Sequence, residues 1–89
     1  MMLERLPEEQ RLRTLHAMRQ IGIDVQQVWI RYFSIGGNVD EFELDAYLHG
    51  LIRLTSLDRN MISHAVNELI DEAPRPAAPY DDDDALRDL

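Results

Sequence analysis

Residues 38–44, Asn38-Val39-Asp40-Glu41-Phe42-Glu43-Leu44, decide the fold, because they carry the clearest helix start in the chain. An aspartate at the N-cap and a glutamate three residues later form a capping box, and the flanking valine and leucine occupy the positions of a hydrophobic staple. The stretch predicts a helix over 41–53. The buried face of that helix is predicted to be Leu44, Tyr47, Leu48, Leu51 and Ile52.

The next helix downstream is predicted over 57–72. Thr55 or Ser56 caps it, and Asp58 lies in its first turn, where a negative charge favours the helix dipole. A wide apolar face indicates contact with two neighbouring helices at once. The residues of that face are Met61, Ile62, Ala65, Val66, Leu69 and Ile70.

Two further helices are predicted upstream. Asp24 caps a helix over 25–35, which we expect to contribute most of the core, and residues 36–38 break it. Its apolar face is Val25, Val28, Trp29, Tyr32 and Phe33. The first helix is expected over 8–20, starting at Pro7 and stopping at Gly22, with residues 1–6 frayed.

These elements predict an all-α fold, a compact bundle of three to four short helices in one domain, residues 1–73. No segment alternates as a strand does. The 89-residue length allows one small domain, and cysteine is absent. Prolines from Pro74 onward end the domain, and we expect residues 74–89 to form a disordered, acidic tail rich in proline and aspartate.

The charge pattern restricts the partners. The formal net charge is −8, and binding to a phosphate backbone needs clustered basic residues, so nucleic acid is disfavoured. No run approaches the length of a membrane-spanning helix, and the N-terminus lacks the pattern of a secretory signal. We therefore expect a cytoplasmic protein without membrane contact.

The histidines do not form a metal-binding pattern. His16, His49 and His64 lie on three different predicted helices, and no two are four residues apart as zinc ligands on one helix are. Whether they converge in space is left open. His16 lies beside the apolar stripe of its helix, formed by Leu12, Leu15 and Met18, and is expected to be packed and hydrogen-bonded. The sequence thus predicts neither a metal site nor a cofactor.

No catalytic site is predicted. Asp45, His49 and Arg53 follow one polar edge at intervals of four residues, which is more typical of a solvent-facing charge ladder than of an orienting pair beside a nucleophile. Ser63 and His64 are adjacent in a helix, so their side chains diverge and do not form a dyad. The loop at 36–38 resembles a phosphate cradle, but Asp40 places a carboxylate where the anion would sit, and no lysine follows.

Two apolar residues break the pattern of their helices. Phe42 projects away from the predicted buried face, and Ile30 lies outside the apolar stripe of its helix. Each is equally compatible with burial in the monomer or with a patch for a partner protein. The polar face of the last helix, with Asn60, His64 and Asn67, is either a hydrated surface or a docking face.

The tail offers a second candidate contact. It is either a solubilising end or a short acidic and hydrophobic motif whose leucines anchor a helix in a groove. The candidate contact residues of the tail are Tyr80, Asp81, Asp82, Asp83, Asp84, Leu86 and Leu89.

Residues 28–37 (VWIRYFSIGG), 48–51 (LHGL) and 65–68 (AVNE) together resemble short uncharacterised helical proteins of GC-rich bacteria. The resemblance spans about residues 21–72, implies a bacterial source, and carries no activity and no site residues. The use of arginine for all nine basic residues points the same way.

The leading functional hypothesis is a small non-catalytic module that binds another protein, or a second copy of itself as a homodimer, or has a regulatory role. The first alternative is a transcription-associated domain resembling a helix-turn-helix, although the acidic third helix is unlike a recognition helix. The second alternative is an uncharacterised enzyme that uses the edge with Asp45 and His49.

Overall fold

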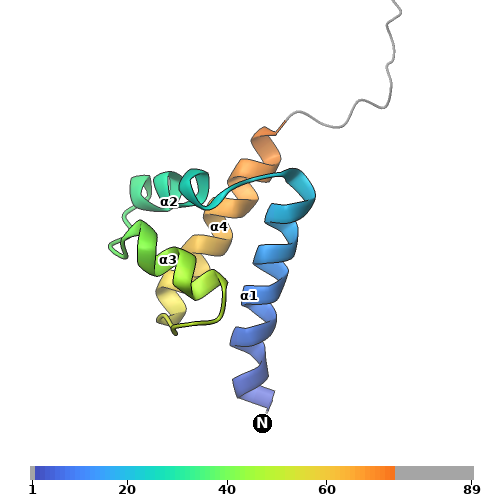
Figure 1. Ribbon diagram of the computed structural model, residues 1–89, viewed down its shortest axis with the longest axis vertical. Coiled ribbons are helices and arrows are strands. Elements are labelled where there is room, and N and C mark those ends of the chain that lie inside the picture. The colour runs from blue at the N-terminus through green and yellow to red at the C-terminus, as the bar shows by residue number, and fades with distance from the viewer. Residues whose placement is uncertain (1, 74–89) are drawn as a thin grey trace, which may run out of the picture.

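The computed structural model describes residues 2–73, which form four helices (Figure 1). They are α1 (Met2–Ile21), α2 (Val25–Ser34), α3 (Glu41–Leu48) and α4 (Ser56–Glu72). No strand occurs in this part of the chain, so the predicted all-α bundle is confirmed. None of these helices is both long and apolar enough to cross a bilayer.

Helix α1 is longer than the sequence predicted. It begins at Met2, so the predicted start at Pro7 is wrong, whereas the expected fraying of residues 1–6 stays a prediction. Pro7 lies inside the helix rather than at its first position. Because proline has no backbone N–H, the helix lacks one backbone hydrogen bond at this interior position. The predicted stop at Gly22 is confirmed, since the amides of Gly22 and Ile23 both donate to the carbonyl of Met18, at 2.8 and 2.9 Å.

The end of α2 is fixed by Tyr32, whose side chain is completely buried. The Tyr32 hydroxyl accepts hydrogen bonds from the amides of Asn38 and Val39 at 3.1 and 3.0 Å, and donates to Asp58 Oδ1 of α4 at 2.7 Å. A Cβ at Gly37 would lie 2.2 Å from the ring. The loop at residues 36–38 is therefore an interhelix turn wrapped around this tyrosine.

Helix α3 ends five residues earlier than predicted. The capping box of Asp40 and Glu43 forms as expected, but the chain leaves the helix at Gly50, which has a φ of +78°. Leu51 and Ile52 were predicted to be buried on the α3 face, and both are exposed, because the helix no longer carries them toward the core.

Helix α4 packs against both α1 and α2, as its wide apolar face predicted. Thr55 is its N-cap, and its hydroxyl accepts the amide of Asp58. Arg31 of α2 ties the far end of α4, donating to Glu72 at 2.7 Å through each of two nitrogens and to Glu68 at 3.1 Å. The core consists of Met18, Val28, Tyr32, Leu44, Tyr47, Leu48, Ile62, Ala65 and Val66.

Candidate functional site

Phe42 is the most exposed large apolar side chain of the described residues, with 82% of its surface open. The reason is local. The capping box fixes the start of α3, and Leu44 then points into the core, so that Phe42, two residues earlier, faces outward. The alternative that Phe42 is buried inside the monomer is therefore wrong.

A shallow hollow of about 570 Å³ lies beside Phe42, between the starts of α2 and α3. Three carboxylates line it, those of Asp24, Glu41 and Asp45. Its other lining residues are Val25, Gln26 and Phe42, so no basic side chain of the described chain lines the hollow. Sequence reasoning identified Phe42 but missed this acidic surrounding, because Asp24 reaches it only through the packing of α2 on α3.

Ile30 is also exposed, at 55%, which excludes its burial in the monomer as well. It lies one turn beyond Gln26 on the same side of α2, since residues four apart share a helix face. Gln26 lines the hollow, so the fold places Ile30 one turn from the surface that surrounds Phe42. We define the Phe42 surface as Phe42, Ile30, Asp24, Glu41 and Asp45.

The prediction that Phe33 belongs to the core-facing stripe of α2 is wrong. Its side chain is exposed and stacks on Trp29, with ring centroids 5.3 Å apart. Trp29 itself is half-buried, and its indole Nε1 donates to the carbonyl of Val39 at 2.9 Å. The stripe on α2 therefore contributes Val28 and Tyr32 to the core and leaves its last member at the surface. Helices α3 and α4 each contribute three core residues, so the expectation that α2 supplies most of the core is wrong.

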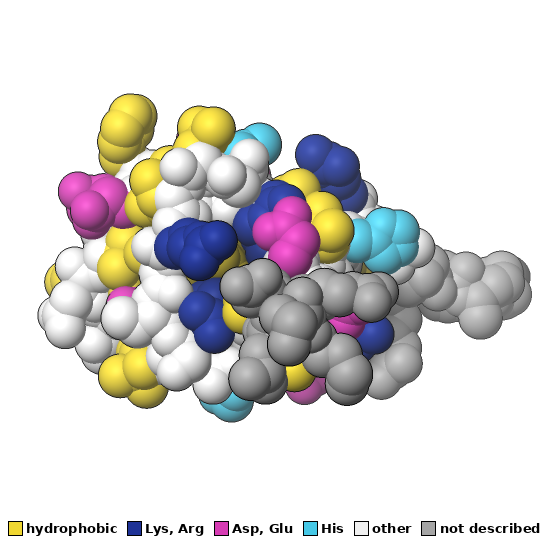
Figure 2. Space-filling model, turned by 90° about the horizontal axis from the view of Figure 1, so that it is seen from below, with side chains coloured by type: hydrophobic (Ala, Val, Ile, Leu, Met, Phe, Trp, Pro, Cys, Tyr) yellow, Lys and Arg dark blue, Asp and Glu magenta, His cyan; other side chains and the backbone are white. Residues whose placement is uncertain are grey.

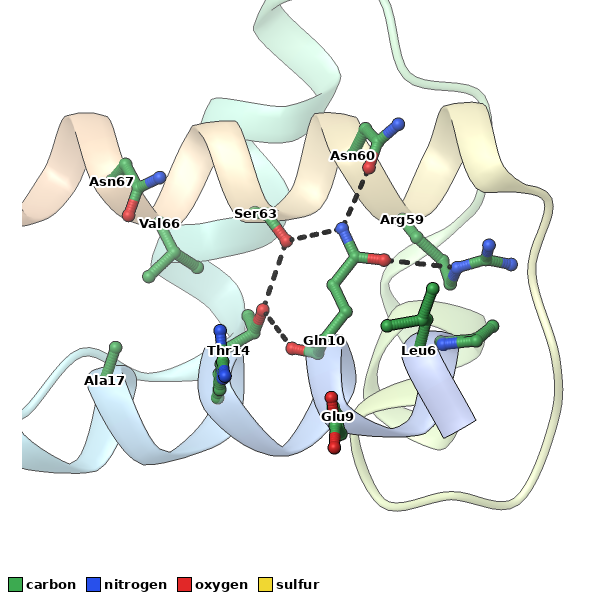
Figure 3. Close-up of a pocket in the computed structure, with 12 residues that line it drawn as sticks. Leu6, Glu9, Gln10, Thr14, Ala17, Arg59, Asn60, Ser63, Val66 and Asn67 are labelled. Atoms are coloured by element: carbon green, nitrogen blue, oxygen red, sulfur yellow. Dashed lines mark hydrogen bonds between the residues drawn. The ribbon is translucent and has the colours of Figure 1, made fainter. Parts of the chain in front are cut away.

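A second hollow, of about 600 Å³, runs between α1 and α4 (Figure 3). Gln10 extends from α1 toward α4 and donates to Asn60 at 2.9 Å and to Ser63 at 3.2 Å. The hydroxyls of Thr14 and Ser63 lie 3.1 Å apart, and Thr14 also donates to the carbonyl of Gln10 at 2.8 Å. These groups satisfy one another, so the network joins two helices, and Asn60 belongs to it rather than to a free docking face.

The three histidines do not come together in the fold. His64 Nε2 contacts Glu68 Oε2 at 2.9 Å, whereas Ser63 faces α1, so the two do not form a dyad. His49 Nδ1 lies 3.2 Å from Asp45 Oδ1, but the predicted ladder does not continue to Arg53, because α3 has already ended. His16 is exposed, not packed as predicted. Within residues 2–73, no three potential ligands gather around a metal position.

The candidate contacts of the tail, from Tyr80 to Leu89, lie outside the described residues.

Comparison with known proteins gives no relative: no family model, no curated protein and no solved structure matches this chain.

Proposed function

We propose that this protein is a small cytoplasmic interaction module, without catalytic activity, that binds another protein through the Phe42 surface. The observation that carries the proposal is the 82% exposure of Phe42 on a helix start held rigid by its capping box. Large aromatic side chains supply much of the binding energy at protein interfaces. Phe42 offers that contact at little entropic cost, because the backbone beneath it is already fixed.

The charge around Phe42 specifies the chemistry of the partner. Asp24, Glu41 and Asp45 surround the ring on one side. A partner that presents an apolar pocket bordered by lysine or arginine is complementary to this arrangement, and such complementarity accelerates association and selects the partner. A symmetric contact between two copies would bring the two acidic surfaces together, which disfavours a homodimer through this surface.

The two alternative functions receive no comparable support. The first turn of α3 carries Glu41 and Glu43, and its last turn has no basic residue, so α3 is poorly suited to approach DNA phosphates. The pair of Asp45 and His49 is exposed at the surface. The tail, Tyr80–Leu89, remains a predicted second contact.

A matched pair of variants tests the proposal. Phe42→Ser removes the aromatic anchor, and Leu57→Ser removes another exposed apolar residue (67% open) in the first turn of α4. Partner capture from a lysate of the source organism, treated with nuclease, is compared for the wild type and both variants. We expect Phe42→Ser to lose a stoichiometric protein that Leu57→Ser retains, and capture to weaken with added salt.

Equal capture by the two variants would exclude the Phe42 surface as the contact. Recovery of the chain itself as the only bound protein would exclude a separate partner and support self-association instead.

A further inference from the structure

A third pocket, of about 420 Å³, lies at the opposite end of the bundle from the α1–α2 turn. The first turns of α1, the loop between α3 and α4, and the start of α4 enclose it. Figure 2 looks at this end and shows basic side chains gathered beside acidic ones. The pocket is separate from the Phe42 surface, and none of its residues lines the hollow beside Phe42.

The pocket is positively charged within an acidic protein. Among the described side chains, three arginines, Arg11, Arg53 and Arg59, line it together with one carboxylate, Glu8. The local formal charge is therefore about +2 (three arginines less one glutamate), whereas the whole chain carries −8. Such a local excess attracts anions and repels cations.

Backbone carbonyls hold two of these arginines in place. Arg11 donates to the carbonyl of Leu48 at 2.8 Å and pairs with Glu8, and Arg59 donates to the carbonyl of Leu54 at 2.7 Å. A Cβ at Gly50 would lie 3.2 Å from Arg11 Cζ, so the glycine allows the guanidinium to lie against the loop. Each guanidinium has five N–H donors, so both retain donors for a further acceptor.

Tyr47, one of the residues that line the pocket, carries a buried hydroxyl without a partner among the described residues. Tyr47 is 3% exposed, and its hydroxyl has no hydrogen-bond partner among the described side chains and backbone groups. Buried polar atoms are nearly always hydrogen-bonded, so an unpaired one points to an additional ligand. Burial raises the pKa of Tyr47, while the neighbouring Arg59 and Arg11 lower it, and the hydroxyl remains a donor at neutral pH.

We propose that this pocket binds the phosphate group of a small molecule, held by Arg11, Arg53 and Arg59 and by a hydrogen bond from the Tyr47 hydroxyl. A phosphate monoester carries about −1.5 to −2 charges at neutral pH, which matches the net charge of the pocket. Arginine is well suited to hold phosphate oxygens through paired N–H donors. Ile52 and Leu54 provide an apolar wall for the remainder of the ligand.

The hydroxyl of Tyr47 is covered in this structure, so its hydrogen bond to phosphate requires a neighbouring side chain to move aside. Arg53 also lines the pocket, is exposed and makes no hydrogen bond to the described part of the chain, so its guanidinium is free to turn toward the ligand.

Titration of the full chain with inorganic phosphate tests the proposal, with chloride at matched ionic strength as the reference and amide chemical shifts as the readout. We expect saturable shifts around Tyr47 and Gly50, with a Kd of about 1 mM. Butyl phosphate should bind several-fold more tightly than phosphate, because its chain contacts Ile52 and Leu54. A saturable response to phosphate alone would assign the site to the free ion rather than to an organic phosphate.

Three variants sharpen the test. Tyr47→Phe removes only the unpaired hydroxyl, so it should fold normally and bind phosphate about tenfold more weakly. Arg53→Gln should also weaken binding, whereas Arg13→Gln, which changes an exposed arginine of α1 outside this pocket, should not. Absence of saturable shifts in the wild type, or unchanged affinity in Tyr47→Phe, would overturn the proposal.

Discussion

Two buried tyrosines provide a direct test of the energetics of this fold. Tyr32 and Tyr47 are 0% and 3% exposed, but the hydroxyl of Tyr32 makes three hydrogen bonds and that of Tyr47 makes none within residues 2–73. Replacement by phenylalanine deletes the same oxygen atom at both sites. The two substitutions should therefore differ only by the hydrogen bonds that are lost.

At Tyr32 the loss should be large. The substitution leaves the amides of Asn38 and Val39 unpaired and takes a donor from the Asp58 carboxylate, and a bond to a charged group contributes more than a neutral one. We expect Tyr32→Phe to lower the free energy of unfolding by about 2–5 kcal/mol. This is a large share of the total of about 5–10 kcal/mol expected for a domain of this size.

At Tyr47 the expected change is small or favourable, because removal of an unpaired buried hydroxyl relieves a desolvation cost. Urea unfolding followed by circular dichroism gives both free energies, and unchanged m-values would show that the two transitions are comparable. A loss below about 1 kcal/mol in Tyr32→Phe, or equal losses in both variants, would refute the role of this hydrogen-bond cluster.

Two further stability predictions concern the same packing and the far end of α4. Gly37→Ala should destabilise the protein by about 2–4 kcal/mol in urea unfolding, because the new methyl group would overlap the Tyr32 ring. Gly22→Ala is the control, since no atom lies within 4 Å of a Cβ there and the substitution reports only the strain of positive φ. Equal losses in the two variants would contradict the steric argument. The hydrogen bonds from Arg31 hold the pKa of Glu72 below its ordinary value of 4.5. The stability that this pair contributes is therefore fully present above about pH 4.5 and is lost as the pH falls through the lowered pKa of Glu72. Glu72→Gln should therefore reduce the dependence of the free energy of unfolding on pH below about pH 4.5. An unchanged dependence in this variant would contradict the assignment.

The starts of α2, α3 and α4 were predictable because their chemistry is local, whereas the start of α1 was not. Asp24, Asp40 and Thr55 cap three of the helices, and in each case the side chain accepts an amide three residues ahead. The helix lengths were less predictable. The apolar residues after Leu48 continue the helical period, but Gly50 has already turned the chain out of α3.

For the candidate sites as well, local features were predictable from the sequence and features that depend on packing were not. The departure of Phe42 and Ile30 from the helical pattern was visible in the sequence, but their exposure in the monomer required the packed structure. The pocket around Tyr47 had no sequence signal, because Tyr47 lies on the apolar face of its helix and reads as a core residue. The residues that line the pocket, from Pro7 to Arg59, come from three segments that only the fold brings together.

Site-specific photo-cross-linking at residue 42 is the most direct test of the proposed interaction. A benzoylphenylalanine in place of Phe42 keeps an exposed aromatic ring at the centre of the Phe42 surface, and the same group at Leu57 is the matched control. The proposal predicts one cross-linked partner protein from position 42 in cells of the source organism, with a basic surface, and no such product from position 57. The same products from both positions, or none from position 42, would contradict it.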